Sequence, residues 1–229
     1  MHRNRLLLLA AAVAAAVIVV VVLIAVGAGK DSKQTVTGSS PRSTHAQLFN
    51  GVAQHGATLG SPAAPATLTV FEDPQCPFCR EWNDNALASV IGDFVRPGKL
   101  KLVYRGVNII GPNSEQGLRA IYAAAQQNRL WNVVEALYDR QGAENSGWIT
   151  NSVIRAAAAA AGANGDAILA ASSSPSVTAQ LRAAAREASA IGLPGTPTFI
   201  VQRPLSKPQR LNAPLDASGF ESALAAALR

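Results

Sequence analysis

The pattern of hydrophobic and polar positions predicts two strand-containing parts with a long helical part between them. The segment ATLTVFED, which starts at Ala66, is short and β-branched and follows the turn-forming SPAAP, so it predicts a strand. The alternating KLKLVYR, residues 99–105, predicts a second strand. Residues 67–105 therefore form a predicted strand–helix–strand unit. Its helix shows four apolar residues at helical spacing: Leu87, Val90, Ile91 and Phe94.

The middle of the chain, residues 113–191, shows apolar stripes at helical spacing that are separated by helix breakers. Gly162 and Gly192 stand where a glycine commonly ends a helix. Beyond them, PTFIVQR predicts another strand, with which QRLNAP can pair, and a final helix begins near SGFE. In that helix Ser218 and Glu221 fit a capping box, in which each side chain satisfies the free backbone N–H of the other.

A long apolar run, Leu6 to Val26, precedes these segments, and its 21 residues match the roughly 20 that cross a bilayer as a helix. The apolar region of a cleaved signal peptide is usually only about 7–15 residues long, so the length favours an uncleaved anchor over that alternative. We expect a cytoplasmic N-terminus over residues 1–5, a transmembrane helix over 6–27 and a flexible tether over 28–44. The folded domain, 45–229, would then lie outside the cytoplasmic membrane.

Composition and charge exclude one class of partner. Hydrophobic residues make up 48% of the 229, enough for a sizeable core, and the net charge is +6. Without Arg3 and Arg5, which precede the apolar run, 18 basic residues remain against 14 acidic ones, a net charge of +4. The sequence contains no run of Lys and Arg and no alternation of basic with aromatic residues, so we expect no nucleic-acid partner.

The two cysteines, Cys76 and Cys79, lie in FEDPQCPFCR at the predicted strand-to-helix turn. A zinc site needs about four ligands, and beyond the apolar run the chain offers only His45 and His55, in the tether or just past it, so we expect no metal. A structural disulfide stabilises most when it closes a long loop, which this spacing does not. The favoured interpretation is a redox pair that cycles between dithiol and disulfide.

The predicted position of Cys76 suits redox chemistry. At a helix N-terminus the unsatisfied N–H groups and the macrodipole favour an anion, which stabilises a thiolate and lowers the pKa of the thiol. Pro77 fits the first helical position, because its fixed φ suits a helix and no N–H is needed there. Cys79, one turn later, should point inward. Cys76 is then the exposed nucleophile that forms mixed disulfides, and Cys79 resolves them.

Two further features accompany the pair. Glu72 and Asp73 end the first predicted strand. Either acid, if buried near Cys79, can accept the thiol proton with a raised pKa of its own, whereas an exposed acid would only begin the loop. Far along the chain, Thr196-Pro197 precedes a predicted strand, an unusual place for proline. A cis bond there would expose the backbone of Thr196 beside the cysteines, where an extended peptide can pair with it.

Together, LGSPAAPATLTVFEDPQCPFC, the helical segments and GTPTFIV resemble the thioredoxin-fold thiol oxidoreductases of the disulfide-bond protein A (DsbA) type, and more closely its membrane-anchored actinobacterial and Gram-positive relatives. The resemblance covers about residues 45–229. It implies an α/β, thioredoxin-like fold whose core, about residues 60–110 and 193–229, is interrupted by a helical subdomain at about 111–192. The transmembrane helix over 6–27 would precede this domain.

The resemblance also implies roles for the site residues. It implies Cys76 as nucleophile, Cys79 as resolving thiol, a redox-active Cys76–Cys79 disulfide, and Pro197 as a cis-proline facing them, with no cofactor. It implies exported protein substrates with free thiols and a quinone-linked membrane reoxidase of the DsbB or vitamin K epoxide reductase-like kind. The dipeptide Pro77-Phe78 departs from the best-known DsbA pattern, which has histidine second, and leaves the oxidising strength open.

We therefore predict a membrane-anchored thiol–disulfide oxidoreductase that introduces disulfides into exported proteins. Two alternatives stay open: an anchored thiol reductase or disulfide isomerase, and a non-catalytic peptide-binding chaperone that merely retains its disulfide. Besides the two cysteines, the predicted active-site support consists of Glu72, Asp73, Pro77, Phe78, Thr196 and Pro197.

Overall fold

A six-stranded sheet forms the centre of the domain in the computed structural model, which describes residues 47–229. Its strands lie in the order β1-β2-β4-β3-β5-β6. The strands are β1 (Gln54–His55), β2 (Thr58–Leu59), β3 (Ala66–Glu72), β4 (Leu100–Gly106), β5 (Thr198–Gln202) and β6 (Gln209–Leu211).

β3 lies between β4, with which it pairs in parallel, and β5, with which it pairs antiparallel. Phe71 near the end of β3 lies opposite Thr198 at the start of β5. Leu68 and Val70 on one face of β3 and Phe71 on the other are all buried, because helices cover the sheet on both sides. The arrangement confirms the predicted strand–helix–strand unit and brings the end of β3 beside the start of β5. The predicted pairing of β6 with β5 is also confirmed.

The helix after β3 differs from the single helix that the spacing predicts. It consists of α3 (Pro77–Asn85), α4 (Leu87–Val90) and a π-helical turn, η1 (Ile91–Val95), with an interruption at Ala86. The predicted apolar face is nevertheless correct, since Leu87, Val90, Ile91 and Phe94 are all buried. Packing of this face on the sheet preserves the apolar stripe through the change in helical pitch.

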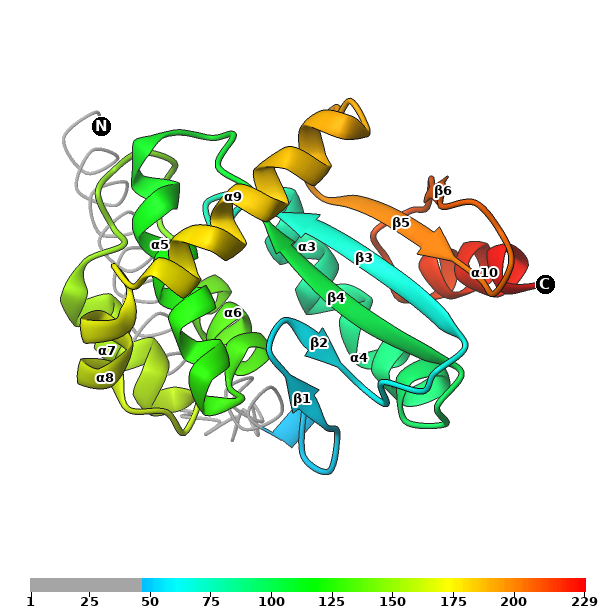
Figure 1. The fold of residues 1–229 in the computed structure, drawn as a ribbon, viewed down its shortest axis with the longest axis horizontal. Coiled ribbons are helices and arrows are strands. Elements are labelled where there is room, and N and C mark those ends of the chain that lie inside the picture. The colour runs from blue at the N-terminus through cyan, green and yellow to red at the C-terminus, as the bar shows by residue number, and fades with distance from the viewer. Residues whose placement is uncertain (1–46) are drawn as a thin grey trace, which may run out of the picture. The chain divides into compact units, whose positions relative to one another are not determined.

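The helical part runs from β4 to β5, in agreement with the pattern over residues 113–191. It consists of α5 (Pro112–Ala124), the short 3₁₀ turn η2 (Ala125–Gln127), α6 (Leu130–Tyr138), α7 (Asn151–Ala160), α8 (Gly165–Ala171) and α9 (Pro175–Ala190). Gly162 and Gly192 follow α7 and α9 with φ of 66° and 56°, left-handed values that glycine adopts without a side-chain clash. Figure 1 shows α5 to α8 grouped at the end of the sheet where β3 and β4 end.

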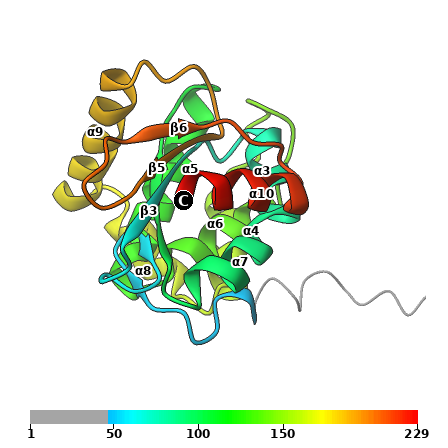
Figure 2. The same cartoon turned by 90° about the vertical axis from the view of Figure 1, so that its right-hand side faces the viewer.

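Two layers of helix cover the sheet (Figure 2). α9 lies on one face, where Ala184 and Ala188 pack with Phe71 and Val107. On the other face lie α3, α4 and the C-terminal helix α10 (Ala217–Leu228). There the rings of Trp82, Phe199 and Phe220 contact one another at centroid distances of 4.7–5.6 Å, which fixes the inner side of α3 against β5.

The predicted capping box at the start of α10 is wrong. Asp216 is the N-cap, and its Oδ1 accepts hydrogen bonds from the backbone N–H of Gly219 and from the Ser218 hydroxyl, both at 2.9 Å. The helix starts at Ala217, so Ser218 already lies inside its first turn. An aspartate two residues earlier satisfies the free N–H groups equally well, and spacing alone does not separate the two choices.

Among residues 47–229, no helix has both the length and the apolar character needed to cross a membrane. The predicted cytoplasmic segment (1–5), transmembrane helix (6–27) and tether (28–44) lie outside the described residues, as does His45. His55 lies in β1 and is exposed.

Candidate active site

Both cysteines lie at the junction between β3 and α3, as the sequence predicts. Cys76 is the N-cap of α3, with an extended backbone (φ −73°, ψ 118°), and Pro77 is the first helical residue. The Cys76 N–H donates to the Asp73 carbonyl oxygen at 3.0 Å, which closes the turn after β3. Both cysteines are free thiols in this structure.

The Cys76 thiol has a pKa lowered from its ordinary 9.0 to about 6. The largest cause is a hydrogen bond from the Cys79 thiol, which stabilises the thiolate more than burial opposes it. The Thr196 side chain and the backbone N–H groups of Cys79 and Phe78 lower the pKa further. The last two are first-turn groups of α3 that have no partner within the helix. Cys76 is therefore mostly thiolate at neutral pH.

Cys76 is not the exposed thiol that the sequence predicts, because only 2% of its surface is accessible. The segment before β5 covers it: Cys76 Sγ lies 3.2 Å from the Thr196 carbonyl oxygen, to which it donates when the thiol is protonated. The Thr196–Pro197 bond is cis, as the resemblance implies. The Thr196 hydroxyl is buried and has no hydrogen-bond partner among the described residues, so it is free to donate to a thiolate. Phe78 is 59% exposed beside the covered sulfur.

Cys79 points inward, as predicted, and is completely buried. The pKa of Cys79 lies well above the ordinary 9.0, mainly because the thiol is buried. The hydrogen bond that Cys79 donates to Cys76 and the charge of Glu72 raise this pKa further. The two thiols of one helical turn therefore have opposite acid–base character.

Glu72 is the buried acid next to this inner thiol. Its Oε1 accepts a hydrogen bond of 2.7 Å from the Asn83 amide, and the same amide donates to the Cys79 carbonyl oxygen at 2.8 Å. The Tyr138 hydroxyl lies 3.4 Å from the other Glu72 oxygen. Burial is the main reason that the pKa of Glu72 lies well above its ordinary 4.5, with a further rise from the charge of Glu135. Of the alternatives considered for Glu72, the buried acid is the one observed.

Asp73 is buried too, but its carboxylate holds two loops together. Oδ1 accepts from the backbone N–H of Gln75 at 2.9 Å and from the Ser114 hydroxyl at 2.6 Å. Oδ2 accepts from the N–H groups of Ile109 and Ile110 at 2.9 and 3.0 Å. These four hydrogen bonds occupy the carboxylate, so the exposed loop acid is wrong for Asp73 and a structural role fits it best.

Several polar residues of the helical part hold the turn that carries Cys76, and the sequence analysis missed them. The Gln141 side-chain amide donates to the carbonyl oxygens of Pro74 and Cys76, both at 3.1 Å. The Gln75 amide donates to Ser114 at 2.8 Å and accepts from the Asn145 N–H at 2.7 Å. These contacts join residues 39–70 positions apart, and no local pattern marks them.

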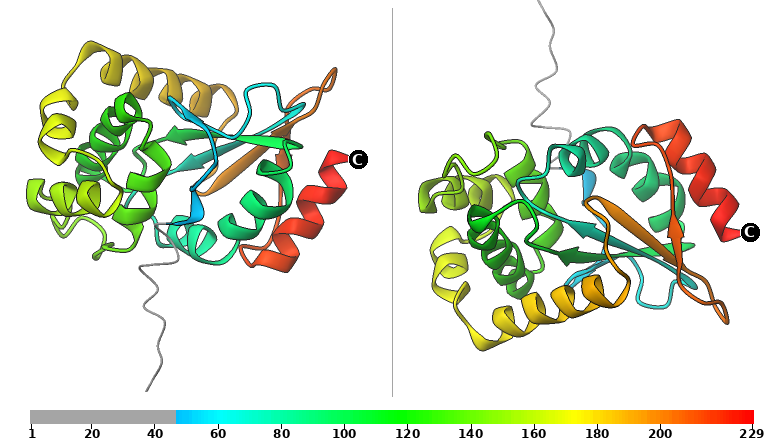
Figure 3. Two further views of the ribbon diagram at one scale, coloured as in Figure 1. Left: turned by 90° about the horizontal axis from the view of Figure 1, so that it is seen from below. Right: turned by 90° about the horizontal axis from the view of Figure 1, so that it is seen from above.

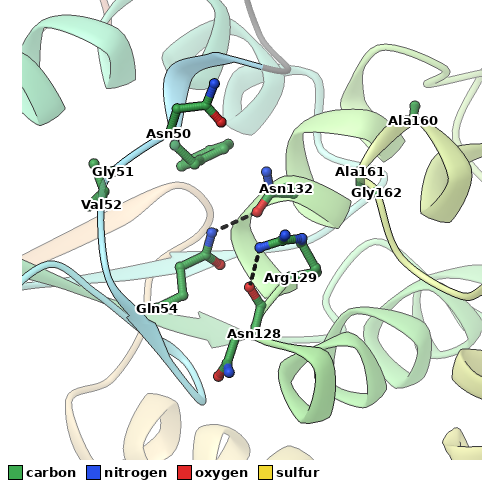
Figure 4. Close-up of a pocket in the computed structure, with 11 residues that line it drawn as sticks. Asn50, Gly51, Val52, Gln54, Asn128, Arg129, Asn132, Ala160, Ala161 and Gly162 are labelled. Atoms are coloured by element: carbon green, nitrogen blue, oxygen red, sulfur yellow. Dashed lines mark hydrogen bonds between the residues drawn. The ribbon is translucent and has the colours of Figure 1, made fainter.

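A separate cavity of about 420 Å³ lies between the segment around β1 and the start of α6, and none of the predicted site residues lines it. Figure 4 shows its polar lining: the Gln54 amide donates to Asn132 Oδ1 at 2.6 Å, and Arg129 donates to the Asn128 carbonyl oxygen at 3.3 Å. No residue of the cysteine site takes part in this lining, so the cavity is separate from the cysteines.

The sequence profile described as thioredoxin matches residues 53–218, most of the chain. This chain belongs to the thioredoxin family. Over 99 residues it is 28% identical to the probable disulfide bond formation protein D of Bacillus cereus, a match that covers 42% of this chain and 46% of that relative. A match to disulfide bond formation protein D of Bacillus subtilis is 26% identical and covers 42% of this chain and 44% of that protein. The matched regions thus span less than half the length of these relatives.

Solved structures of the thioredoxin family give the same result for the fold. A thioredoxin-like oxidoreductase from Silicibacter pomeroyi superimposes with a TM-score of 0.59 at 28% identity, over 79% of this chain and 95% of that one. BdbD from Bacillus subtilis superimposes with a TM-score of 0.65 at 18% identity, over 77% of this chain and 97% of that one. DsbA from Chlamydia trachomatis superimposes with a TM-score of 0.61 at 20% identity, over 76% of this chain and 90% of that one. These comparisons confirm the predicted thioredoxin-like α/β fold and the resemblance to DsbA-type proteins.

The site of this thioredoxin-family chain provides the parts that thiol–disulfide exchange needs. Cys76 supplies a stabilised thiolate, Cys79 a second thiol within hydrogen-bond reach, and Glu72 a buried acid whose charge acts on Cys79. A thiol with a lowered pKa is a good leaving group, and one with a raised pKa needs a proton as it leaves a disulfide.

Proposed function

We propose that this protein is a thiol–disulfide oxidoreductase that introduces disulfides into exported proteins through the pair Cys76 and Cys79. The observation that carries the proposal is the opposite acid–base character of these adjacent thiols, one with a pKa of about 6 and the other well above 9.0. Stabilising the Cys76 thiolate favours the reduced pair and therefore makes the disulfide form a stronger oxidant.

The proposed reaction starts from the disulfide form of the pair. A client thiolate attacks the sulfur of Cys76, the Cys76–Cys79 bond breaks, and Cys79 leaves. Because Cys79 has a raised pKa, it takes up a proton, and the protonated Glu72 is the proposed donor. A second client thiolate then attacks the client sulfur of the mixed disulfide and releases Cys76 as thiolate. The client gains one disulfide, and the pair gains two electrons.

The remaining roles follow the resemblance and the geometry around Cys76. Pro77 starts the helix whose N–H groups face the thiolate, and the exposed ring of Phe78 offers an apolar contact to a client. Thr196 and Pro197 cover the sulfur, and the Thr196 segment is the proposed place where an extended client lies against the site. Asp73 keeps the turn in place.

The location is part of the proposal. We infer a single-pass anchor over residues 6–27, with residues 1–5 in the cytoplasm and the thioredoxin domain outside the membrane, from the length of the apolar run. Disulfides persist in that compartment. Relatives called disulfide bond formation protein D support clients whose free thiols become disulfides. That these clients are exported proteins follows from the proposed location. A quinone-linked membrane protein of the DsbB or vitamin K epoxide reductase-like kind would then reoxidise the pair.

A redox titration of the full chain against glutathione tests the direction of transfer. We expect a reduction potential nearer to about −120 mV, the value of a strong oxidant, than to about −270 mV, the value of a thioredoxin. A value at the reducing end would instead support the anchored reductase or isomerase. If a Cys76→Ser variant supports disulfide formation in exported clients as well as the wild type does, the non-catalytic chaperone is correct and the enzyme proposal is wrong.

A further inference from the structure

A groove of about 520 Å³ opens at the end of the sheet where β3 begins, away from the cysteines. It lies between the start of β3, the end of η1, the segment after β5 and the end of α10. The apolar part of its lining consists of Pro65, Ala66, Phe94, Pro204, Ala225 and Leu228. The groove thus presents an open apolar surface on the domain.

Three cations complete the lining of this groove: Lys99, Arg203 and Arg229. No Asp or Glu belongs to the lining; Asp93, which precedes Phe94, is outside it. Among the described residues, none of the three cations forms an ion pair, and the Lys99 ammonium lies 5.9 Å from the centre of the Phe94 ring. The positive charge at this groove is therefore available to a partner.

The connection between β5 and β6 extends this surface. Leu205 at its tip is fully exposed, and Pro204 beside it lines the groove. Arg203 and the exposed Lys207 stand on either side of Leu205 in the chain. A single exposed leucine is common on protein surfaces, but one between two cations and next to an apolar groove forms a continuous amphipathic patch. Figure 3 shows this hairpin and the C-terminus at the same end of the domain in both views.

We propose that this patch docks the domain on an anionic lipid bilayer. Leu205 and the apolar groove would enter the boundary between headgroups and acyl chains, while Lys99, Arg203 and Arg229 bind lipid phosphates. A second copy of the chain fits poorly, because a twofold contact would bring the same cations of both copies together. An acidic peptide would match the cations but gives no reason for the protruding leucine.

Docking in this way orients the reactive end of the domain. β5 runs from its start beside the cysteine turn to the patch, and its five residues cover roughly 14 Å. The cysteines would therefore face away from the lipid, toward exported clients. If residues 6–27 anchor the chain, the segment from there to residue 47 spans at most about 70 Å when extended, which keeps the patch near the bilayer. The proposed orientation of the domain on the bilayer depends on the proposed function in one respect, namely the membrane anchor over residues 6–27.

The test uses the full chain reconstituted in vesicles, with tryptophan at position 205 (Leu205→Trp) and acyl-chain-brominated lipid as quencher. We expect quenching in phosphatidylglycerol vesicles and little in phosphatidylcholine vesicles. Each Lys or Arg near an anionic surface contributes about fivefold to membrane partitioning, so replacing Lys99, Arg203 and Arg229 by Gln should lower the docked-to-undocked ratio by about 100-fold. The matched control is Gln126→Trp, an exposed position in η2 at the helical end, which should not be quenched.

Three results would overturn the proposal. The first is quenching at position 205 that does not exceed quenching at position 126. The second is equal quenching in both lipids that the charge replacements leave unchanged. The third is protection of position 205 that depends on protein concentration or on an added acidic peptide instead of lipid, which would identify a second copy or a peptide as the occupant. Alkylation of Cys76 in the same samples reports separately on the thiol chemistry, so failure of docking and failure of the proposed function are distinguishable.

Discussion

The outer and inner sides of the Cys-Pro-Phe-Cys turn differ in acid–base character although they share one helix. On the outer side, the Cys79 thiol, the Thr196 hydroxyl and the free N–H groups at the start of α3 can each donate to the Cys76 thiolate, and the pKa of Cys76 falls to about 6. On the inner side, Cys79 and Glu72 are enclosed by the core, and burial raises the pKa of both. The same backbone thus stabilises charge at one position and excludes it one turn later.

This difference shows that the helix N-terminus alone does not set the pKa of a cysteine. Burial opposes ionisation at both sulfurs, and the number of donors that face each sulfur decides the outcome. Cys76 collects the donors, whereas Cys79 is itself one of them. Five substitutions in four experiments test this contrast, from the largest expected effect to the smallest.

Replacing either cysteine by serine should distinguish the role of Cys76 from that of Cys79 most clearly. Cys76→Ser removes the thiolate that attacks and leaves, so we expect client oxidation to fall by about 10³-fold or more. Cys79→Ser keeps Cys76 and a hydroxyl donor beside it, so mixed disulfides with clients should accumulate. Non-reducing gel electrophoresis of trapped complexes measures both outcomes. Adducts that form through Cys79 in the Cys76→Ser variant would reverse the assigned roles.

Glu72→Gln should slow proton transfer at Cys79 on the inner side without changing the pKa of Cys76 on the outer side. The glutamine can still accept from Asn83 but cannot move a proton to or from Cys79, and loss of a general acid or base typically costs about 10²-fold or more. The measurement is stopped-flow kinetics of mixed-disulfide formation between the oxidised pair and a client thiol at pH 7, the step in which Cys79 leaves. The alkylation midpoint of Cys76 should stay near 6. Glu81→Gln, at an exposed position of α3, is the matched control. Equal rates in both variants would remove Glu72 from the proton transfer.

Thr196→Val should weaken only the stabilisation of the Cys76 thiolate, on the outer side of the turn. The fold lowers the pKa of Cys76, so its thiolate stabilises the reduced protein fully above pH 9.0, and this contribution is lost as the pH falls through about 6. Removing the hydroxyl donor should raise the alkylation midpoint by about one to two units, since hydrogen bonds to charged groups contribute about 1.5–3 kcal/mol. Iodoacetamide alkylation across pH measures the midpoint, with Thr69→Val on β3 as control. An unchanged midpoint would show that the backbone N–H groups and Cys79 suffice to lower the pKa of Cys76.

Gln141→Leu should affect the position of the turn more than its charge. The change removes two hydrogen bonds to the carbonyl oxygens of Pro74 and Cys76, about 2 kcal/mol in total, which corresponds to a fall in melting temperature of about 4–8 °C. The alkylation midpoint should stay near 6, because these bonds do not reach the sulfur. Differential scanning calorimetry measures the melting temperature, and Gln126→Leu at an exposed position is the control. A shifted alkylation midpoint without a lower melting temperature would show that Gln141 acts on the charge of Cys76 and not on the position of the turn.

The strand pattern, the Cys-x-x-Cys spacing and Pro77 were sufficient to place the cysteines at a strand-to-helix turn. These features act locally: β-branched residues favour a strand, and proline fits the first helical position whatever surrounds it. The same local reasoning failed where several neighbouring residues can serve equally, as at Asp216 and Ser218. It also failed where the helix after β3 is interrupted at Ala86 and becomes π-helical at Ile91. Local preference there is too weak to select one geometry.

Roles that depend on burial were not predictable in the same way. Glu72 and Asp73 are adjacent acids at the end of one strand, yet one has a raised pKa and the other is held by four hydrogen bonds from residues up to 41 positions away. Cys76 is covered by a segment 120 residues later in the chain. Desolvation and long-range hydrogen bonds arise only when distant segments pack together.

The sequence by itself determined the class of fold, the reactive pair and the apolar face of each element, because these follow from spacing, propensity and the identity of the side chains. Only the tertiary structure decided that Thr196 covers the Cys76 sulfur, which of the two acids is held by hydrogen bonds and which acts on Cys79, and which end of the sheet carries the groove lined by cations. Each of those properties depends on which polar groups lose water and which donors replace it, and a linear sequence specifies neither until the chain has folded.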